Sequence, residues 1–434
     1  MRKAAMTMLL KPLKEVVVKK MAIRLTVAVI AGWCSLALAQ DTVNLEMTVW
    51  GGETDVKTYT ERLTMCTEGT GTSVELTHIP TEYDQKVLTR IAGGNSPDIM
   101  MFAEQIHAYS SRGQLLALDS FVEEAGLDLD SRFSPESVEL YRRDGQLYAL
   151  PDRSGAMVLF YNKDLFDAAG VEYPSTEWTW DDLLSASQAL TVRDDSGNVS
   201  QWGFAVVDWW PHWMTFMYQN GGSVLDAEGR PMVNAEANIE AIQFFNDLVF
   251  EHRVAPSPED YANLGITSPD TLFAQGTLAM DITGFWNIDA LRSVDAFNWD
   301  IVPMFGEVQN ATSPFFSGLA ISSDSDHPAE AFEVVSCMTD APAQERIAAN
   351  AEDAPANIQV LRSDAFLNPE WAPADINMEA FAQSQNMLID LPLIPEWNEM
   401  MKAFGDNLSS VFINGGDVEG ALNAVQSQLE FIIQ

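Results

Sequence analysis

The chain has 434 residues, a formal net charge of −39 and a sequence pI of about 4.2. At about 100–200 residues per domain, this length predicts two domains with an ample core. The strong negative charge argues against nucleic acid or an anionic membrane surface as a partner, although it says little about the lining of any pocket.

The N-terminus has the features of a cleaved secretory leader. Seven basic residues precede an uncharged apolar run over residues 25–39, which ends in the small-x-small pattern of Ala37-Leu38-Ala39. The run is shorter than the ~20 residues of a membrane-spanning helix, and its ending favours cleavage between Ala39 and Gln40. Met21 is an alternative start that gives the same mature product. We therefore expect residues 1–39 to be removed and the remainder to be a soluble periplasmic protein.

Strands and helices alternate along the first part of the mature chain. The alternating apolar residues, with Gly51-Gly52 and Gly93-Gly94 as breaks, predict strands at 44–50, 73–79 and 99–102 and helices at 54–67 and 83–92. This order predicts βαβ units on a parallel sheet, and hence an α/β fold.

The α/β pattern continues to the C-terminus. Two strand-like runs at 147–151 and 156–161 are separated by Asp152-Arg153-Ser154-Gly155, and Asp152 and Arg153 lie in this presumed hinge segment. Helices are expected after Trp180 and at residues 235–251, 328–339, 341–349 and 396 to the end.

Two cysteines, Cys66 and Cys337, follow the leader. An exported chain meets an oxidising compartment, so the pair could form a disulfide. Two buried free thiols are the alternative, and the residues leave this choice open.

The motifs of common enzyme and metal sites are missing from the sequence. The five histidines are scattered without zinc-ligand spacing, and the chain has neither a G-x-x-x-x-G-K-[ST] phosphate loop nor a G-x-S-x-G elbow. We therefore expect no catalytic residue, no metal and no cofactor.

Several segments, taken in order, resemble the extracellular solute-binding proteins of ATP-driven importers, in particular the maltose-binding-like family. They span most of the mature chain and include a G-x-x-P-D turn, a Y-A-L-P segment and an F-x-x-G-x-x-A-M block followed by G-F-W. The corresponding residues are 94–98, 148–151, 159–166, 180–183, 273–280, 284–286, 318–322 and 327–332.

The resemblance implies two α/β lobes with the ligand between them. Lobe one would comprise residues 41–151 and 302–349, and lobe two residues 152–301 and 350–434. It also implies a monomer that closes on its ligand by hinge bending, with hinge crossings near Pro151 and near 299–303. The same resemblance returns Cys337 to the lobe of Cys66.

The function implied is capture of a small polar ligand, with a sugar as the preferred class, and its delivery to the membrane subunits of an ABC permease, without chemistry. The chain departs from the family at residues 351–355, where a glycine-containing turn is usual. Ligand contacts at that loop stay open.

Sugar sites combine aromatic platforms with fixed polar groups, and the chain has 12 tryptophans. Core packing is the alternative for each aromatic residue, and an ion pair or a solvated turn is the alternative for Asp152 and Arg153. The candidates lie at predicted strand ends, in the presumed hinge and in aromatic runs: Trp50, Glu53, Phe102, Glu104, Gln105, Asp152, Arg153, Trp209, Trp210, His212, Trp286 and Trp397.

Other ligands and one enzyme class remain as alternatives. Carboxylates between aromatic walls would also suit a polyamine, and a sugar alcohol would use the same groups. An organophosphate would need several basic residues, of which Arg153 is the one strong candidate. An exported glycoside hydrolase would need two carboxylates about 5–10 Å apart across the cleft.

Overall fold

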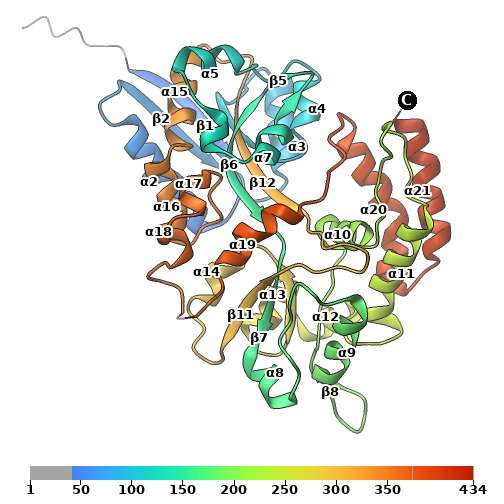
Figure 1. The fold of residues 1–434 in the computed structure, drawn as a ribbon. Coiled ribbons are helices and arrows are strands. Elements are labelled where there is room, and N and C mark those ends of the chain that lie inside the picture. The colour runs from blue at the N-terminus through green and yellow to red at the C-terminus, as the bar shows by residue number, and fades with distance from the viewer. Residues whose placement is uncertain (1–41, 374, 434) are drawn as a thin grey trace, which may run out of the picture. The chain divides into compact units, whose positions relative to one another are not determined.

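Two β-sheets, each with its own helices, form the framework of the chain in the computed structural model, which describes residues 42–373 and 375–433. The larger sheet has the order β2-β1-β3-β12-β6 and the smaller one β10-β7-β11. Figure 1 shows the two α/β regions, with β6 and β12 of the larger sheet leading toward β7 and β11 of the smaller one. The predicted α/β fold is confirmed. The leader and its cleavage site lie outside the described residues.

The larger sheet is mixed. β1 is parallel to β3, as the βαβ pattern predicts, whereas β12 is antiparallel to both β3 and β6. Its strands are β1 (Val43–Val49), β2 (Thr72–His78), β3 (Ile99–Phe102), β6 (Ala149–Ala156) and β12 (Pro314–Ile321).

The smaller sheet is antiparallel on both sides of its central strand. Its strands are β7 (Val158–Asn162), β10 (Met280–Thr283) and β11 (Trp299–Pro303). Two short hairpins complete the strands: β4 (Arg142–Arg143) with β5 (Gln146–Leu147), and β8 (Val192–Arg193) with β9 (Val199–Gln201).

Helix α2 (Glu53–Thr67) packs against α15 and α16, which come more than 250 residues later in the chain, and a disulfide joins it to α15. Cys66 on α2 and Cys337 on α15 have Cα atoms 5.7 Å apart and are bonded, so the pairing left open by the sequence is present. The remaining helices near the larger sheet include α3 (Tyr83–Ala92), α4 (Ile106–Ser110), α5 (Asp119–Ala125), α6 (Leu129–Arg132), α7 (Pro135–Leu140), α15 (Pro328–Met338), α16 (Ala341–Asn350), α17 (Ile358–Leu361) and α18 (Asp364–Leu367).

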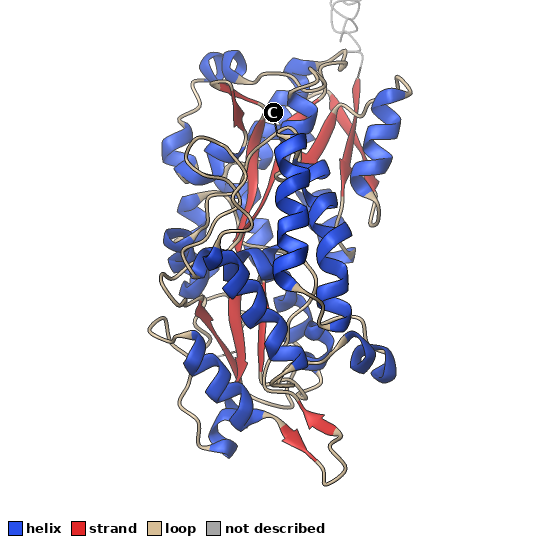
Figure 2. Ribbon diagram, turned by 90° about the vertical axis from the view of Figure 1, so that its right-hand side faces the viewer, coloured by secondary structure: helices blue, strands red, loops and turns tan. Residues whose placement is uncertain are grey.

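The C-terminal helices pack beside α10 and α11 around one large apolar core (Figure 2). The predicted helix from 396 to the end is two helices, because Gly415 adopts the left-handed conformation (φ 67°) and ends the first of them. The helices of this part are α8 (Lys163–Ala169), α9 (Trp180–Leu190), α10 (Trp210–Gln219), α11 (Glu236–Phe250), α12 (Pro258–Leu264), α13 (Pro269–Ala274), η1 (Phe285–Asn287), α14 (Ile288–Leu291), α19 (Glu379–Ser384), η2 (Gln385–Met387), α20 (Trp397–Asn414) and α21 (Val418–Ile432).

The predicted break between two strands at Asp152-Arg153-Ser154-Gly155 is wrong. These residues belong to β6, which pairs with β12 over its whole length. The register shifts between Ser317 and Gly318, which leaves Asp152 as the extra residue of a β-bulge. A bulge re-aims side chains, and here it directs both Asp152 and Arg153 toward α2.

The chain passes from the larger sheet to the smaller one at Met157, between β6 and β7, and it returns between β11 and β12. The lobe boundaries by residue number stay a prediction. No helix within residues 42–373 and 375–433 combines the length and apolar character needed to cross a membrane.

Candidate functional site

Two adjoining cavities lie where the first strand, β6, β12 and the G-F-W segment meet. The first, of about 520 Å³, is called here the Trp286 compartment, and the second, of about 430 Å³, the Glu104 compartment. Both are lined by Trp50 and Phe315, so these two rings separate the compartments.

The start of α2 supplies one wall of the Trp286 compartment. β1 ends at Trp50, and Gly51 has a φ of 114° that turns the chain into the helix. A Cβ atom at Gly51 would overlap the carboxylate of Asp55, which accepts a hydrogen bond of 2.6 Å from the backbone N–H of Gly52. The turn therefore places Trp50, Glu53 and Asp55 together at the cavity.

Trp286 forms the aromatic wall opposite. Its indole lies over Gly284, where an added Cβ would come within 2.0 Å of the ring, so this position requires glycine. The ring is half-buried and packs against Phe315 (centroid distance 4.6 Å) and Trp209 (5.9 Å). Trp50, Trp209 and Trp286 thus all contribute to one compartment.

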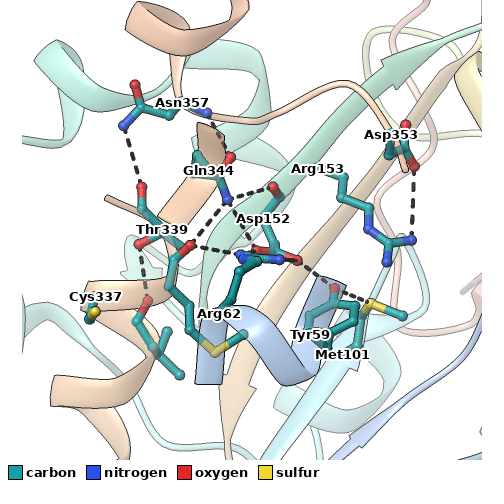
Figure 3. A network of polar contacts seen from close by, with 12 residues as sticks. Tyr59, Arg62, Met101, Asp152, Arg153, Cys337, Thr339, Gln344, Asp353 and Asn357 are labelled. Carbon is teal, nitrogen blue, oxygen red and sulfur yellow. Dashed lines mark hydrogen bonds and ion pairs between the residues drawn. The ribbon is translucent and has the colours of Figure 1, made fainter. Parts of the chain in front are cut away.

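Arg153 is the one basic residue among those lining this compartment, and it faces three carboxylates. Its guanidinium pairs with Asp55 Oδ1 (2.7 Å), with Glu352 Oε1 and with Asp353 Oδ2 (3.9 Å). Figure 3 shows Arg153 and Asp353 side by side. Burial raises the pKa of Glu352 to about 8 and that of Asp353 to about 7, with Arg153 opposing both shifts.

Asp152 does not face the cavity, which corrects its place among the candidate ligand contacts. Its side chain is fully buried and pairs with Arg62, and it accepts further hydrogen bonds from Tyr59 Oη (2.5 Å) and Gln344 Nε2 (3.2 Å). Arg62 also donates to the carbonyl oxygen of Met338 (2.7 Å). Asp152 therefore joins α2, β6 and the α15–α16 region instead of pairing with Arg153.

The Glu104 compartment carries further carboxylates. Gln105 donates from Nε2 to Asp84 Oδ1 (2.9 Å), and Glu104 lies beside them at the cavity wall. Burial, with a smaller contribution from Asp84, raises the pKa of Glu104 to about 7. Trp397 also lines this compartment, although it is 3% exposed and packs edge-on against Trp210 (5.3 Å).

Three other candidates line neither compartment. Phe102 ends β3, but its ring is fully buried against Tyr109 (4.5 Å). His212 is buried within α10, and burial lowers its pKa to about 3. Trp210 packs on Trp397, so Trp209 is the residue of this aromatic run that reaches the Trp286 compartment.

The sequence candidates omitted five acidic or aromatic residues that line the Trp286 compartment: Asp55, Asp289, Phe315, Glu352 and Asp353. For Glu352 and Asp353, the available signal was the difference from the family's usual glycine-containing turn at residues 351–355. Ala351 takes the left-handed conformation (φ 54°) that favours glycine, so the turn is kept and Glu352 and Asp353 reach Arg153. No cluster of His, Cys, Asp or Glu suited to a metal ion occurs in the part of the chain that the structure describes.

Known proteins resemble both the sequence and the fold. An arabinooligosaccharide-binding protein of Halalkalibacterium halodurans is 32% identical over 155 residues, a match that spans 34% of this chain and 33% of that protein. A putative binding protein of Brucella abortus is 21% identical over 420 residues, covering 93% of this chain and 97% of that one. An ABC substrate-binding protein of Listeria monocytogenes, solved in complex with cycloalternan, is 27% identical with a TM-score of 0.82, over 90% of this chain and 99% of that one.

The family model for bacterial extracellular solute-binding proteins matches residues 58–345, which include α2, β6 and the G-F-W segment that build the site. The chain belongs to the bacterial extracellular solute-binding protein family.

Proposed function

We propose that this protein captures a sugar in the two compartments and delivers it to the membrane subunits of an ABC importer. The observation that carries the proposal is the Trp286 compartment, where three tryptophans stand beside Arg153 and several carboxylates. Aromatic faces cover the C–H side of a sugar ring, and charged side chains hold its hydroxyl groups. Of the similar proteins named above, one is an arabinooligosaccharide-binding protein and another was solved in complex with cycloalternan.

The site supports binding without chemistry. A hydrolase of the two-carboxylate type needs an acid and a base facing each other across the scissile bond. In the Trp286 compartment Asp55, Glu352 and Asp353 converge instead on the guanidinium of Arg153. Incubation with labelled oligosaccharides tests this part of the proposal, and released shorter sugars would contradict it.

The cavity charges weigh against an organophosphate ligand. Arg153 is the one basic residue in the lining of the two compartments, and its guanidinium is already paired with carboxylates. An anionic ligand would meet Glu53 and Glu104, for which the lining of the two compartments offers no compensating basic side chain. A sugar alcohol would use the same hydrogen-bonding groups as a sugar, so the ligand screen includes both.

Export, closure and oligomeric state belong to the same proposal. The exported protein would lose residues 1–39, act as a monomer and close on its ligand. N-terminal sequencing of the secreted protein tests the cleavage between Ala39 and Gln40. Small-angle scattering tests the other two points: we expect a monomer whose radius of gyration decreases with bound ligand, and an unchanged radius would contradict closure.

The central test is a thermal-shift screen against mono- and oligosaccharides, sugar alcohols and polyamines, followed by calorimetric titration of each hit. A ligand at about 100 times its Kd stabilises the folded state by roughly 2.7 kcal/mol, which a melting curve resolves. We expect a sugar among the hits. Stabilisation by polyamines alone would contradict the sugar assignment and leave the solute-binding role intact.

A further inference from the structure

The carboxylates around Arg153 outnumber the positive charge that the protein supplies to them. Asp55, Glu352 and Asp353 share a single guanidinium, and the Glu352 and Asp353 side chains are 0% and 5% exposed. Oε2 of Glu352 is buried without a hydrogen-bond partner, and so is Nε of Arg153. Buried carboxylates are stable only when they are paired or neutralised, so without a second cation Glu352 and Asp353 retain protons up to about neutral pH.

The neighbouring charges do not correct the imbalance. Arg62 lies on the next turns of α2, but it is paired with Asp152. Tyr59, which stands between the two arginines, is neutral because burial raises its pKa well above the usual range. Asp289 and Glu53 add further acidic groups to the same compartment, and Arg292 pairs with Asp289 (2.5 Å).

The Glu104 compartment has the same character. Its lining contains Glu82, Asp84 and Glu104 and no basic side chain. Lys86 approaches Glu82 at 3.8 Å on the exposed side of α3, whereas no salt bridge in the described part of the chain includes Asp84 or Glu104. Both compartments therefore favour a positive charge on the ligand over a negative one.

The aromatic walls favour the same kind of ligand. An ammonium group gains free energy over the face of a tryptophan as well as from a carboxylate, and the gain is larger when water is excluded. Trp50, Trp209 and Trp286 line the compartment that holds Glu352. A neutral hydroxyl group would form hydrogen bonds there but would leave the excess of carboxylates uncompensated.

We propose that the ligand is an amine-bearing sugar, whose ammonium group supplies the cation missing from the Arg153–Glu352–Asp353 cluster. The inference rests on the proposed sugar-binding function and adds the charge of the ligand. The free amine distinguishes this class from neutral sugars and from N-acetylated sugars, which have the same ring but carry no charge.

The test compares matched sugars that differ only at the nitrogen. Glucosamine, galactosamine, mannosamine and the β-1,4-linked glucosamine dimer and trimer are titrated against their N-acetylated and hydroxyl counterparts. We expect at least one amine-bearing sugar to bind about tenfold or more tighter than both counterparts, with a preference that weakens at high salt. Equal or tighter binding of every hydroxyl counterpart would overturn the inference while the sugar-binding function stands. If spermidine binds and none of the sugars does, the assignment of a sugar as the ligand is contradicted.

Glu352→Gln locates the effect. The amide keeps the shape and a hydrogen bond to Arg153 but removes the charge, so we expect at least a tenfold loss of affinity for the amine-bearing sugar. The loss of affinity for its hydroxyl counterpart should be clearly smaller, because only the amine loses an ion pair. Glu419→Gln, the same substitution at an exposed position of α21, is the control and should change neither affinity. Equal losses for both sugars would overturn the role of Glu352.

A measurement on the unchanged protein guards against misfolding of the variant. An ammonium beside Glu352 and Asp353 favours their ionised forms, so its binding should release protons at about pH 6.5. The affinity for the amine should then rise from about pH 5.5 to about pH 7, and that of the hydroxyl counterpart should not. Calorimetry in two buffers of different ionisation enthalpy measures the proton release, and its absence would overturn the inference.

Discussion

Two ion clusters lie along one face of α2, and Tyr59 separates them. At the inner end Arg62 pairs with Asp152, one cation with one carboxylate, and Gln344 completes the set. At the outer end Arg153 meets three carboxylates and opens on the Trp286 compartment. Asp152 and Arg153 are consecutive residues, directed to the same helix by the bulge in β6.

The difference between the clusters is one of charge balance. The inner cluster is balanced and closed, so it acts in stability and has no capacity left for a ligand. The outer cluster has an excess of carboxylates, an unpartnered Glu352 oxygen and a cavity beside it. Substitutions in the inner cluster should therefore change folding, and substitutions in the outer cluster should change binding.

The largest expected effect is on the inner cluster. Asp152→Ala leaves Arg62 buried without its partner, which we expect to lower the free energy of unfolding by about 3–5 kcal/mol. Urea unfolding monitored by tryptophan fluorescence measures it. Asp55→Ala is the matched change in the outer cluster and should lower stability by less than about 1 kcal/mol, since it relieves the excess of carboxylates. Equal losses of stability in the two variants would contradict the division into an inner cluster that stabilises the fold and an outer cluster that binds ligand.

The disulfide reinforces the inner end of α2. Cys66–Cys337 and the hydrogen bond from Arg62 to Met338 both attach α2 to the end of α15. Replacing both cysteines with serine should lower the free energy of unfolding by about 2–4 kcal/mol, because the unfolded chain regains a long open loop. Ligand affinity in calorimetry should stay within about twofold. A tenfold loss of affinity would show that the disulfide also determines the geometry of the binding site.

At the outer end, Trp286→Ala should weaken binding by about 2–4 kcal/mol, because a central aromatic platform is lost. Its effect on stability should be smaller than that of a core tryptophan, since the ring is half-buried. Trp299→Ala is the control: Trp299 is 3% exposed and stacks on Phe160, so this change should lower stability by about 3–5 kcal/mol and leave affinity unchanged. Calorimetry measures the affinity of both variants, and melting curves measure their stability. Unchanged affinity together with a large loss of stability in Trp286→Ala would place Trp286 in the core.

Local sequence patterns predicted the elements well where neighbouring residues decide the outcome. Residues 83–92 and 99–102 form the expected helix and strand, since apolar spacing and the Gly93-Gly94 break define them. The bulge at Asp152 could not be predicted in this way. It depends on pairing with β12, more than 150 residues later in the chain.

The candidate site was predicted in part. Strand ends located Trp50 and Glu104 at the cavities, and Trp209 and Trp286, also among the candidates, line the first compartment. Sequence could not tell which side of a strand or helix faces the cleft, and this is why Phe102 and His212 were included and Phe315 was not. For Asp152 the deciding partners, Arg62 and Gln344, lie 90 and 192 residues away.

The smallest expected effect is the pH dependence of stability in the absence of ligand. In the folded state the pKa of Glu352 is about 8 and that of Asp353 about 7, above their usual values of 4.5 and 3.8. The folded protein therefore binds more protons than the unfolded chain, so these two groups stabilise it most at acid pH and their contribution is lost as the pH rises toward about 8. Tyr59, Arg62, Asp152, Arg153 and Asp55 face the same cluster, and of these only Asp55 is more than a tenth exposed.

Glu352→Gln removes one of these titrations and should flatten the decline. From about pH 5 to about pH 8, we expect the free energy of unfolding of the unchanged protein to fall relative to the variant by on the order of 1 kcal/mol. Urea unfolding at four pH values measures the difference. Parallel curves for Glu352→Gln and the unchanged protein would mean that the outer cluster is already balanced, which would remove the physical basis for a cationic ligand.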